Sequence, residues 1–159
     1  MSKTDFLNGQ LLIAQPVNQD KHFAKTIVLL AQHNVTGAWG VVVNKPAKTV
    51  SMTDVMSAVG IEYPKDESVF VGGPVESNRV HVIHTLDWSS PSTMQITNDI
   101  GITGDISILT AISAGEGPAL YRTGVGLAVW SAGQLEGEQS GQSPWTKEHK
   151  WLTAPATIE

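Results

Sequence analysis

The stretch Thr26-Ile27-Val28-Leu29-Leu30-Ala31 decides the fold class, because it is a run of β-branched and aliphatic residues without a charge. A short run of this kind is typical of a strand that is covered on both faces of a sheet. Segments of the same character lie at residues 11–14, 41–43 and 69–71. The sequence therefore predicts central strands in a covered sheet.

Two later segments alternate apolar and polar residues. Residues 79–84 (Arg-Val-His-Val-Ile-His) and 93–97 (Thr-Met-Gln-Ile-Thr) follow this pattern. It favours strands with one face half exposed. We expect these two strands to flank the sheet or to lie at its surface, and a last strand to cover residues 120–130.

Capping and spacing signals predict two helices and a weaker third one. A capping-box pattern at residues 51–54 begins a short helix that ends at Gly60. A clearer helix begins at residues 103–105 and ends at Gly115, since apolar residues recur in it every three or four positions. The third candidate, residues 131–138, contains two glycines. The predicted fold class is α+β (mixed α/β), with two to three short helices.

Length and composition predict one domain over residues 1–159. A hydrophobic content of 41% in 159 residues is enough for one sizeable core. The longest apolar run, residues 27–31, is far shorter than the roughly 20 residues that span a bilayer. The first residues lack the long apolar core of a signal peptide, so we expect a cytoplasmic protein without a membrane partner. The absence of cysteine excludes disulfides, thiol nucleophiles and thiolate zinc sites.

The charge pattern disfavours nucleic-acid binding. Ten Lys and Arg stand against fifteen Asp and Glu, which gives a net charge of −5. The basic residues are scattered along the chain, whereas strong binding to a phosphate backbone needs clustered cations.

The histidines are the first candidates for catalysis or metal binding. His81 and His84 are three apart on an expected strand, so their side chains point to opposite faces and cannot share a metal ion. We expect both to be partly exposed. His33 follows the central strand near Trp39 and Asn44, where it either lines a pocket or caps a turn.

Other catalytic and cofactor motifs are missing from the sequence. No Gly-x-Ser-x-Gly elbow is present. The run Gly72-Gly73-Pro74 lacks the partners of a phosphate-binding loop and predicts a sharp turn. Glu136 and Glu138 are two apart on the weak helix, which predicts a solvated face. We therefore predict no catalytic residue, no metal site and no cofactor.

The tryptophans are expected to mark the core or a cleft, because each buries a large area. Trp39 and Trp130 adjoin small residues, as expected for packed walls. Trp88, Trp145 and Trp151 lie in expected loops or terminal segments.

Several ordered motifs resemble the bacterial YqgE/AlgH family. They lie at residues 8–14 (Asn-Gly-Gln-Leu-Leu-Ile-Ala), 37–46 (Gly-Ala-Trp-Gly-Val-Val-Val-Asn-Lys-Pro), 71–75 (Val-Gly-Gly-Pro-Val), 115–118 (Gly-Glu-Gly-Pro) and 126–136. The resemblance covers nearly the whole chain. It implies a bent, partly barrel-like sheet in a cytoplasmic bacterial protein without an established biochemical role.

The chain departs from the pattern of this family in two places. The last motif usually contains Gly-Tyr-Ala-Gly-Trp, whereas here Leu127 replaces the Tyr and Val129 the second Gly. A role of that aromatic hydroxyl therefore does not carry over. Members usually continue for a few dozen residues beyond a segment such as residues 151–156, so the resemblance implies a C-terminally shortened chain.

The leading hypothesis is a non-enzymatic ligand-binding or regulatory protein whose partner is a small molecule or another protein. Its site is expected among polar or aromatic groups at strand ends and turns, where scaffolds commonly place binding residues. These are His33, Trp39, Asn44, Gly73, Pro74, Trp130 and Gln134. One alternative is a hydrolase or isomerase that uses His33 or His84 as its base. Another is a transcriptional regulator, a role for which one branch of the family is named.

Overall fold

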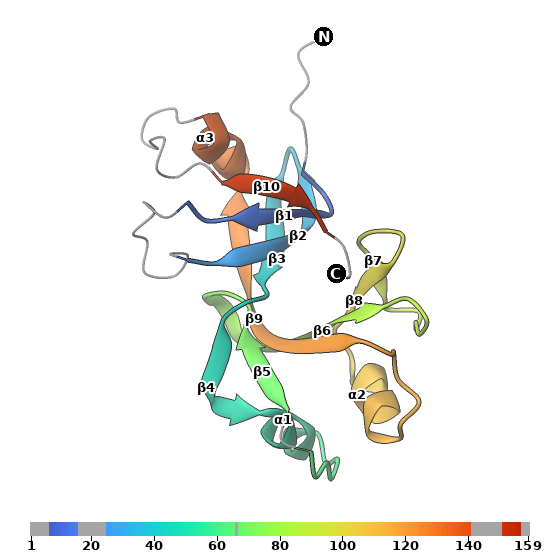
Figure 1. Cartoon of the computed structure of the whole chain (residues 1–159). Helices are drawn as coiled ribbons and strands as arrows, with labels where there is room; N and C mark the ends of the chain where they lie inside the picture. Colours follow the sequence, from blue (N-terminus) through green and yellow to red (C-terminus); the bar gives the residue numbers. More distant parts are fainter. Residues whose placement is uncertain (1–6, 16–24, 66, 141–150, 157–159) are drawn as a thin grey trace.

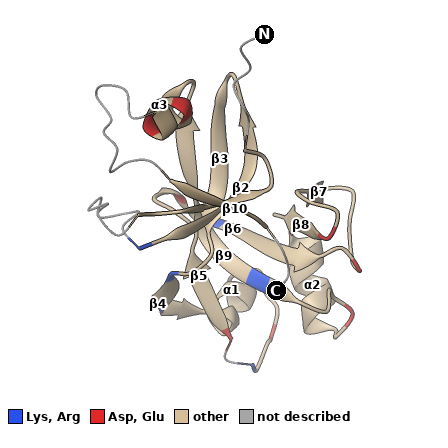
Figure 2. Ribbon diagram, turned by 45° about the horizontal axis from the view of Figure 1, so that its top comes forward, with Lys and Arg blue, Asp and Glu red and all other residues tan. Residues whose placement is uncertain are grey.

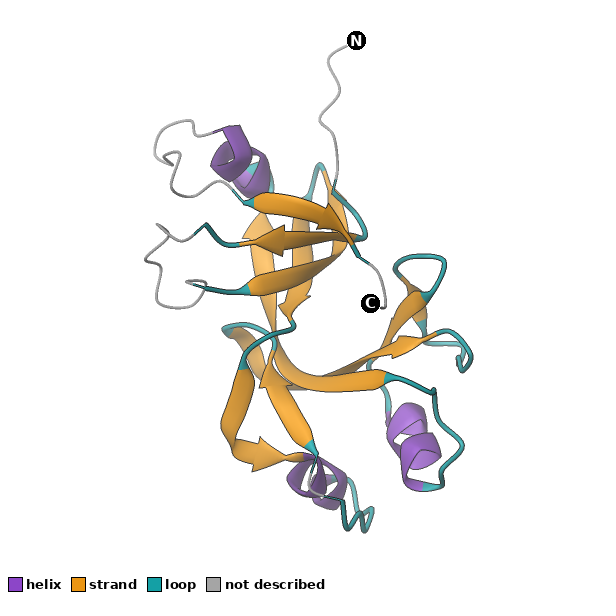
Figure 3. Ribbon diagram, in the orientation of Figure 1, coloured by secondary structure: helices purple, strands orange, loops and turns teal. Residues whose placement is uncertain are grey.

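The computed structural model describes residues 7–15, 25–65, 67–140 and 151–156. These residues form a strongly bent, half-barrel sheet with short helices at its periphery (Figures 1 and 3). In chain order the elements are β1 (Gln10–Ile13), β2 (Ile27–Asn34), β3 (Gly37–Val42), β4 (Pro46–Ser51), α1 (Met52–Ala58), β5 (Ser68–Val71), β6 (Val75–Thr85), β7 (Met94–Gln95), β8 (Ile100–Thr103), α2 (Ile106–Ser113), β9 (Tyr121–Ser131), α3 (Gln134–Ser140) and β10 (Leu152–Pro155).

The long strand β9 joins the two halves of the sheet. The strand order is β10-β1-β2-β3-β9-β6-β8-β7, with β5 also paired to β9 and β4 paired to β5. The C-terminal end of β9 pairs with β3, and its first half pairs in parallel with β5. β6 pairs antiparallel with β9 over most of the length of β9. Figure 1 shows β9 running from the upper group of strands into the lower group.

Apolar side chains form three cores on the two faces of this sheet. One core lies between β1, β2, β3, β9 and α3, and includes Leu12, Leu30 and Trp130. A second core lies beneath α1 and α2. The third lines the concave face of the half-barrel and includes Leu29 and Val41. The concave core meets open space at one end, where the candidate site is found.

Two glycines allow the connection between β5 and β6 to lie against β9. Gly73 has φ +152°, and a Cβ there would lie 2.2 Å from the carbonyl carbon of Leu127. Gly126 has φ +86°, and its Cβ would lie 2.3 Å from the oxygen of Gly73. Only glycine fits such a contact between two backbones. The sharp turn expected at residues 72–74 therefore serves the close approach of two chain segments.

The expected elements are present with shifted ends, but the strand expected to flank the sheet at residues 79–84 belongs to β6, which lies inside the sheet between β9 and β8. The capping box at Ser51 and Asp54 begins α1, and Asp105 caps α2 by accepting a hydrogen bond from the Ser107 amide. The expected strand over residues 93–97 is only the two-residue β7. The sequence did not predict strands β4, β8 and β10, because they lack a clear alternation of apolar and polar residues. No helix among the described residues is long and apolar enough to cross a membrane.

Candidate functional site

A cavity of about 550 Å³ opens at the end of the concave core. This volume is within the usual range for small-molecule sites, about 300 to 1,000 Å³. Strands β2, β3, β6, β7, β8 and β9 all contribute to its walls. The lining residues are Gln32, Asn34, Thr36, Gly37, Ala38, Trp39, Arg79, His81, Ser92, Met94, Ile102, Gly104, Leu127, Val129 and Trp130.

The apolar part of the cavity continues the concave core. Trp39, Ile102 and Leu127 belong both to the lining and to that core. The Trp39 indole N–H donates to Gln32 Oε1 at 3.3 Å, which ties the ring to the neighbouring strand. An apolar group that enters the cavity would therefore contact a wall that is already ordered.

A bulge in β6 brings Arg79 to the rim of this cavity. Val75 pairs with Leu127 and Val80 pairs with Val125, so four residues of β6 lie opposite the single residue between those partners. The bulge includes Glu76, a non-glycine residue at φ +49°. Bulges commonly redirect a side chain, and unfavourable backbone angles occur often at functional sites. Arg79 Nη1 donates to Glu76 Oε2 at 3.1 Å, and both side chains are more than half exposed.

His81 lies two residues further along β6 and also lines the cavity. Its ring is only 4% exposed and lies over two glycines, since a Cβ at Gly72 or Gly124 would come within 2.6 Å of the imidazole. Nε2 donates to the Gly126 carbonyl at 3.0 Å, so the second nitrogen, Nδ1, is an acceptor. This buried Nδ1 has no hydrogen-bond partner among the described residues.

Burial keeps the imidazole of His81 uncharged near neutral pH. It lowers the pKa of His81 from 6.5 to about 4, the hydrogen bond to Gly126 partly opposes this, and the nearby charge of Arg79 lowers the pKa further. The described lining contains no Asp, Glu or Lys, so Arg79 carries its one formal charge at pH 7. The described Lys and Arg residues elsewhere are spread over several elements (Figure 2).

The structure does not bring the seven expected site residues together. Trp39 and Trp130 border the large cavity. Gly73 and Pro74 line a separate recess of about 40 Å³, which has room for little more than one water molecule. The other three, His33, Asn44 and Gln134, are engaged in hydrogen bonds that hold the chain in place.

His33 connects the N-terminal segment to α3. It is 3% exposed, and its Nδ1 accepts from the Leu7 amide at 3.0 Å. Nε2 therefore carries a proton, which it donates to Glu136 Oε1 at 3.0 Å. The side chain of Asn8 bonds both the amide and the carbonyl of His33. Of the two roles expected for His33, its contacts are those of a local structural group.

Asn44 and Gln134 make similar local contacts. Asn44 accepts from the Ile27 amide at 2.8 Å and donates to the Lys25 carbonyl. Gln134 Oε1 accepts from the Ser131 amide, and its Nε2 donates to Glu138 Oε2.

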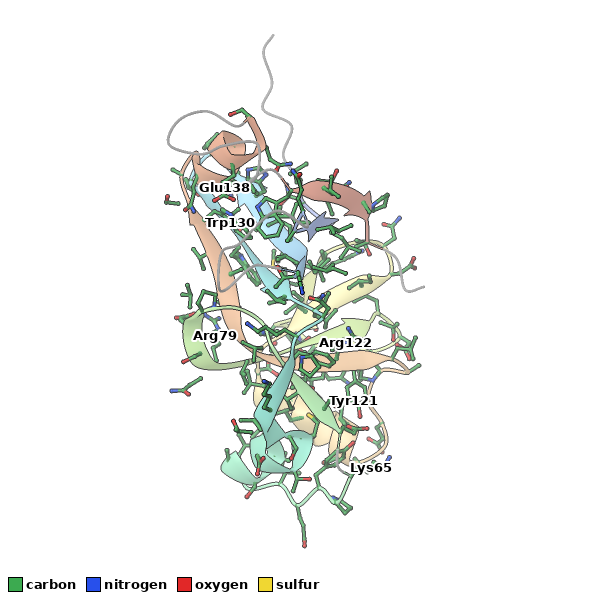
Figure 4. All side chains as sticks on the ribbon, turned by 60° about the vertical axis from the view of Figure 1, so that its left-hand side comes forward. Lys65, Arg79, Tyr121, Arg122, Trp130 and Glu138 are labelled. Carbon is green, nitrogen blue, oxygen red and sulfur yellow. The ribbon has the colours of Figure 1, made fainter. Side chains whose placement is uncertain are left out.

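The predicted solvated face for Glu136 and Glu138 is wrong. Glu138 is only 9% exposed, and its Oε1 accepts from the indoles of Trp130 and Trp151 at 3.0 and 2.9 Å. Trp151 itself is 3% exposed and belongs to the core beneath α3, rather than to an open terminal segment. Figure 4 shows Trp130 and Glu138 together beside α3, apart from Arg79.

His81 and His84 lie on opposite faces as predicted, but the prediction that they are partly exposed is wrong. On β6, Ile83 packs in the concave core, whereas Val82 packs in the helix-covered core. His84, on the same face as Val82, is 2% exposed, and its Nε2 accepts from the Thr103 hydroxyl at 2.8 Å. This pair resembles a base beside a hydroxyl nucleophile, but Thr103 is fully buried and offers no access to a substrate.

Sequence reasoning missed Arg79 and His81 as partners. The signal was present, because positions two apart on a strand share a face. The sequence analysis compared His81 only with His84, and those two side chains lie on opposite faces of the strand.

Comparison with known proteins places the chain in a family. The family described as AlgH-like matches residues 11–159. The chain belongs to the AlgH-like family. The AlgH-like chain is 35% identical to a UPF0301 protein of Rhodospirillum rubrum over 95% of its own length and 77% of the relative. It is 37% identical to a UPF0301 protein of Rhizobium leguminosarum, over 97% and 78% of the two chains.

Two solved structures share the fold of the AlgH-like chain. The solution structure of the AlgH protein from Pseudomonas aeruginosa matches with a TM-score of 0.78 and 32% identity, over 99% of this chain and 82% of that one. The crystal structure of a protein from Corynebacterium diphtheriae matches with a TM-score of 0.75 over 99% and 80%, at 20% identity, and shows the fold alone. The resemblance seen in the sequence motifs and the bent sheet that it implied are confirmed.

Proposed function

We propose that this AlgH-like chain is a non-enzymatic binding protein whose small-molecule ligand occupies the cavity on the concave face. The observation that carries the proposal is the cavity itself, about 550 Å³ with an apolar wall at Trp39 and Leu127 and polar groups at Arg79 and His81. A mostly apolar pocket with a few polar groups is the usual form of a small-molecule site.

The unsatisfied nitrogen of His81 supports a role in binding. Buried polar groups are nearly always hydrogen-bonded, and exceptions are commonest where a structure serves a function. His81 Nδ1 is such an exception among the described residues. The proposal of a binding role without catalysis also fits the two other described histidines, because His33 and His84 are buried and already bonded to their neighbours.

Thermal unfolding in the presence of a metabolite library tests this function. A ligand at 100 times its dissociation constant stabilises the fold by about 2.7 kcal/mol, which raises the midpoint by roughly 5 to 10 °C for a domain of this size. Compounds that raise the midpoint are then titrated against tryptophan fluorescence.

Two matched variants locate the binding. Trp39 lines the cavity, whereas Trp88 is half-buried elsewhere and stacks edge-on against His84. We expect Trp39→Phe to lose most of the ligand-induced fluorescence change and Trp88→Phe to retain it. A response that survives in Trp39→Phe but is lost in Trp88→Phe would place the ligand outside the cavity, and a library without any stabilising compound would speak against the function.

A further inference from the structure

We propose that the ligand of this cavity is a small organic acid whose carboxylate binds Arg79 at the rim while its apolar body lies against Trp39, Leu127 and Met94. This inference rests on the proposed function and specifies its ligand class. Its basis is the distribution of charge: the protein as a whole is negative, yet the one formal charge of the described lining at pH 7 is positive.

The guanidinium of Arg79 retains donors for a ligand. It has five N–H groups in a planar fork, and Glu76 accepts from Nη1. The edge formed by Nε and Nη2 matches the two oxygens of a carboxylate, which is the geometry of a bidentate contact. Glu76 holds the side chain from the other edge, and the bulge fixes both residues on one short segment.

The inner part of the cavity offers a carboxylate no cationic partner. The His81 ring is uncharged near neutral pH and its Nδ1 is buried, so it supplies no charged donor to a ligand. The deep wall near Ile102 and Leu127 is apolar. A carboxylate is therefore favoured at the exposed rim beside Arg79, where it keeps part of its hydration, and the apolar body is favoured inside.

Glu76 allows a second test of the proposal, in which acid binding should change in the opposite direction. Its carboxylate competes with a ligand carboxylate for the same guanidinium, and it is itself more than half exposed. Loss of the charge at Glu76 should tighten the binding of acids, whereas loss of the charge at Arg79 should weaken it.

The test uses sets of compounds that share one body and differ in their head group. Phenylpropyl, indolylpropyl and hexyl bodies are each compared as the carboxylate, the primary amide and the amine, with binding to the full chain measured by tryptophan fluorescence and thermal shift at pH 7. We expect carboxylates to bind about tenfold more tightly than amides, and amines to bind most weakly, as one charge-assisted contact implies.

Three variants complete the test. Arg79→Gln should bring carboxylates to the affinity of the amides and leave amide binding unchanged. Glu76→Gln should strengthen carboxylate binding about two- to threefold. Lys48→Gln removes a positive charge from an exposed position on β4 outside the cavity lining, and should change nothing.

The failures of the two proposals are distinguishable. Equal affinity of the wild-type chain for carboxylates and amines, or a carboxylate preference that survives in Arg79→Gln, would overturn the inference about ligand class and leave a binding cavity in place. Failure of every body to change the fluorescence or the thermal midpoint of the wild-type chain would instead count against the proposed function itself.

Discussion

The polar side chains beneath α3 and those on the concave face of the bent sheet differ in their hydrogen bonding. Beneath α3, the Glu138 carboxylate accepts from two indoles and an amide, and His33 bonds on both of its ring nitrogens. On the concave face, His81 is equally buried, yet one of its nitrogens has no partner among the described residues. Beneath α3 the polar groups hold elements together, whereas on the concave face a residue that lines the cavity keeps one nitrogen without a partner among the described residues.

This difference teaches that burial alone does not distinguish a structural polar group from a binding one. All three side chains are less than a tenth exposed. What separates them is the number of hydrogen bonds that each has already made, because an unmade bond in a buried place costs free energy. The following predictions test whether the two faces differ in this way.

The largest loss of stability is expected from Glu138→Ala. It removes the acceptor shared by Trp130 and Trp151, beneath the helix that carries Glu138. We expect a loss of about 3 to 4 kcal/mol in the free energy of unfolding, measured by denaturant titration. Glu138→Gln keeps one acceptor oxygen and should lose only about 1 kcal/mol. A loss below about 1 kcal/mol in the alanine variant would show that this buried cluster does not stabilise the fold.

A pH-dependent effect is expected from His81. Because burial lowers its pKa from 6.5 to about 4, the unfolded chain binds a proton in this window and the folded chain does not. The full stability is therefore present above pH 6.5 and is lost as the pH falls toward 4, by up to about 3 kcal/mol from this residue.

His81→Gln is the matched control for that titration. Its amide can still donate to the Gly126 carbonyl but does not titrate in this range. We expect unfolding titrations between pH 7.5 and 4 to show a shallower loss of stability in His81→Gln than in the wild type. Parallel curves would mean that the ring takes up its proton in the folded state, and thus that it is open to solvent.

A smaller loss of stability is expected from Glu136→Gln. Glu136 is one quarter exposed, so its contact with the buried His33 ring is partly screened by water. We expect a loss of about 0.5 to 1 kcal/mol, which a shift in the thermal midpoint would detect. A loss as large as that of Glu138→Ala would contradict the ranking by burial.

The smallest effect on stability is expected from Arg79→Gln. Its ion pair with Glu76 is exposed on both sides, and such pairs contribute little. We expect the free energy of unfolding to stay within about 0.5 kcal/mol of the wild type. A clear loss of stability would show that Arg79 fastens the bulge, and would weaken the contrast between the two faces.

The strands and helices were predictable where local chemistry determines them. The aliphatic run that forms β2 and the capping box of α1 depend on neighbouring residues, and both lie where the sequence placed them. The prediction that Glu138 lies on a solvated face was wrong, because helical spacing describes contacts within one helix only. The indole of Trp151 reaches it from 13 residues away, and that contact exists only in the folded chain.

The cavity was beyond prediction for a related reason. Its walls come from strands between Gln32 and Trp130, so no local pattern contains it. The bulge that brings Arg79 to the rim depends on Gly126 of another strand. Alternation along β6 would nevertheless have grouped Arg79 with His81, and that inference was open from the sequence.

The position of β9 late in the chain has a consequence for synthesis of the protein. β3, β5 and β6 all complete their hydrogen-bonding ladders on β9, which begins at Tyr121. Until the ribosome has released that strand, the edges of these three strands that will pair with β9 remain open, and open edges invite pairing with other chains. The nascent chain is therefore exposed to aggregation until β9 has been synthesised, when one strand pairs with the open edges of three others.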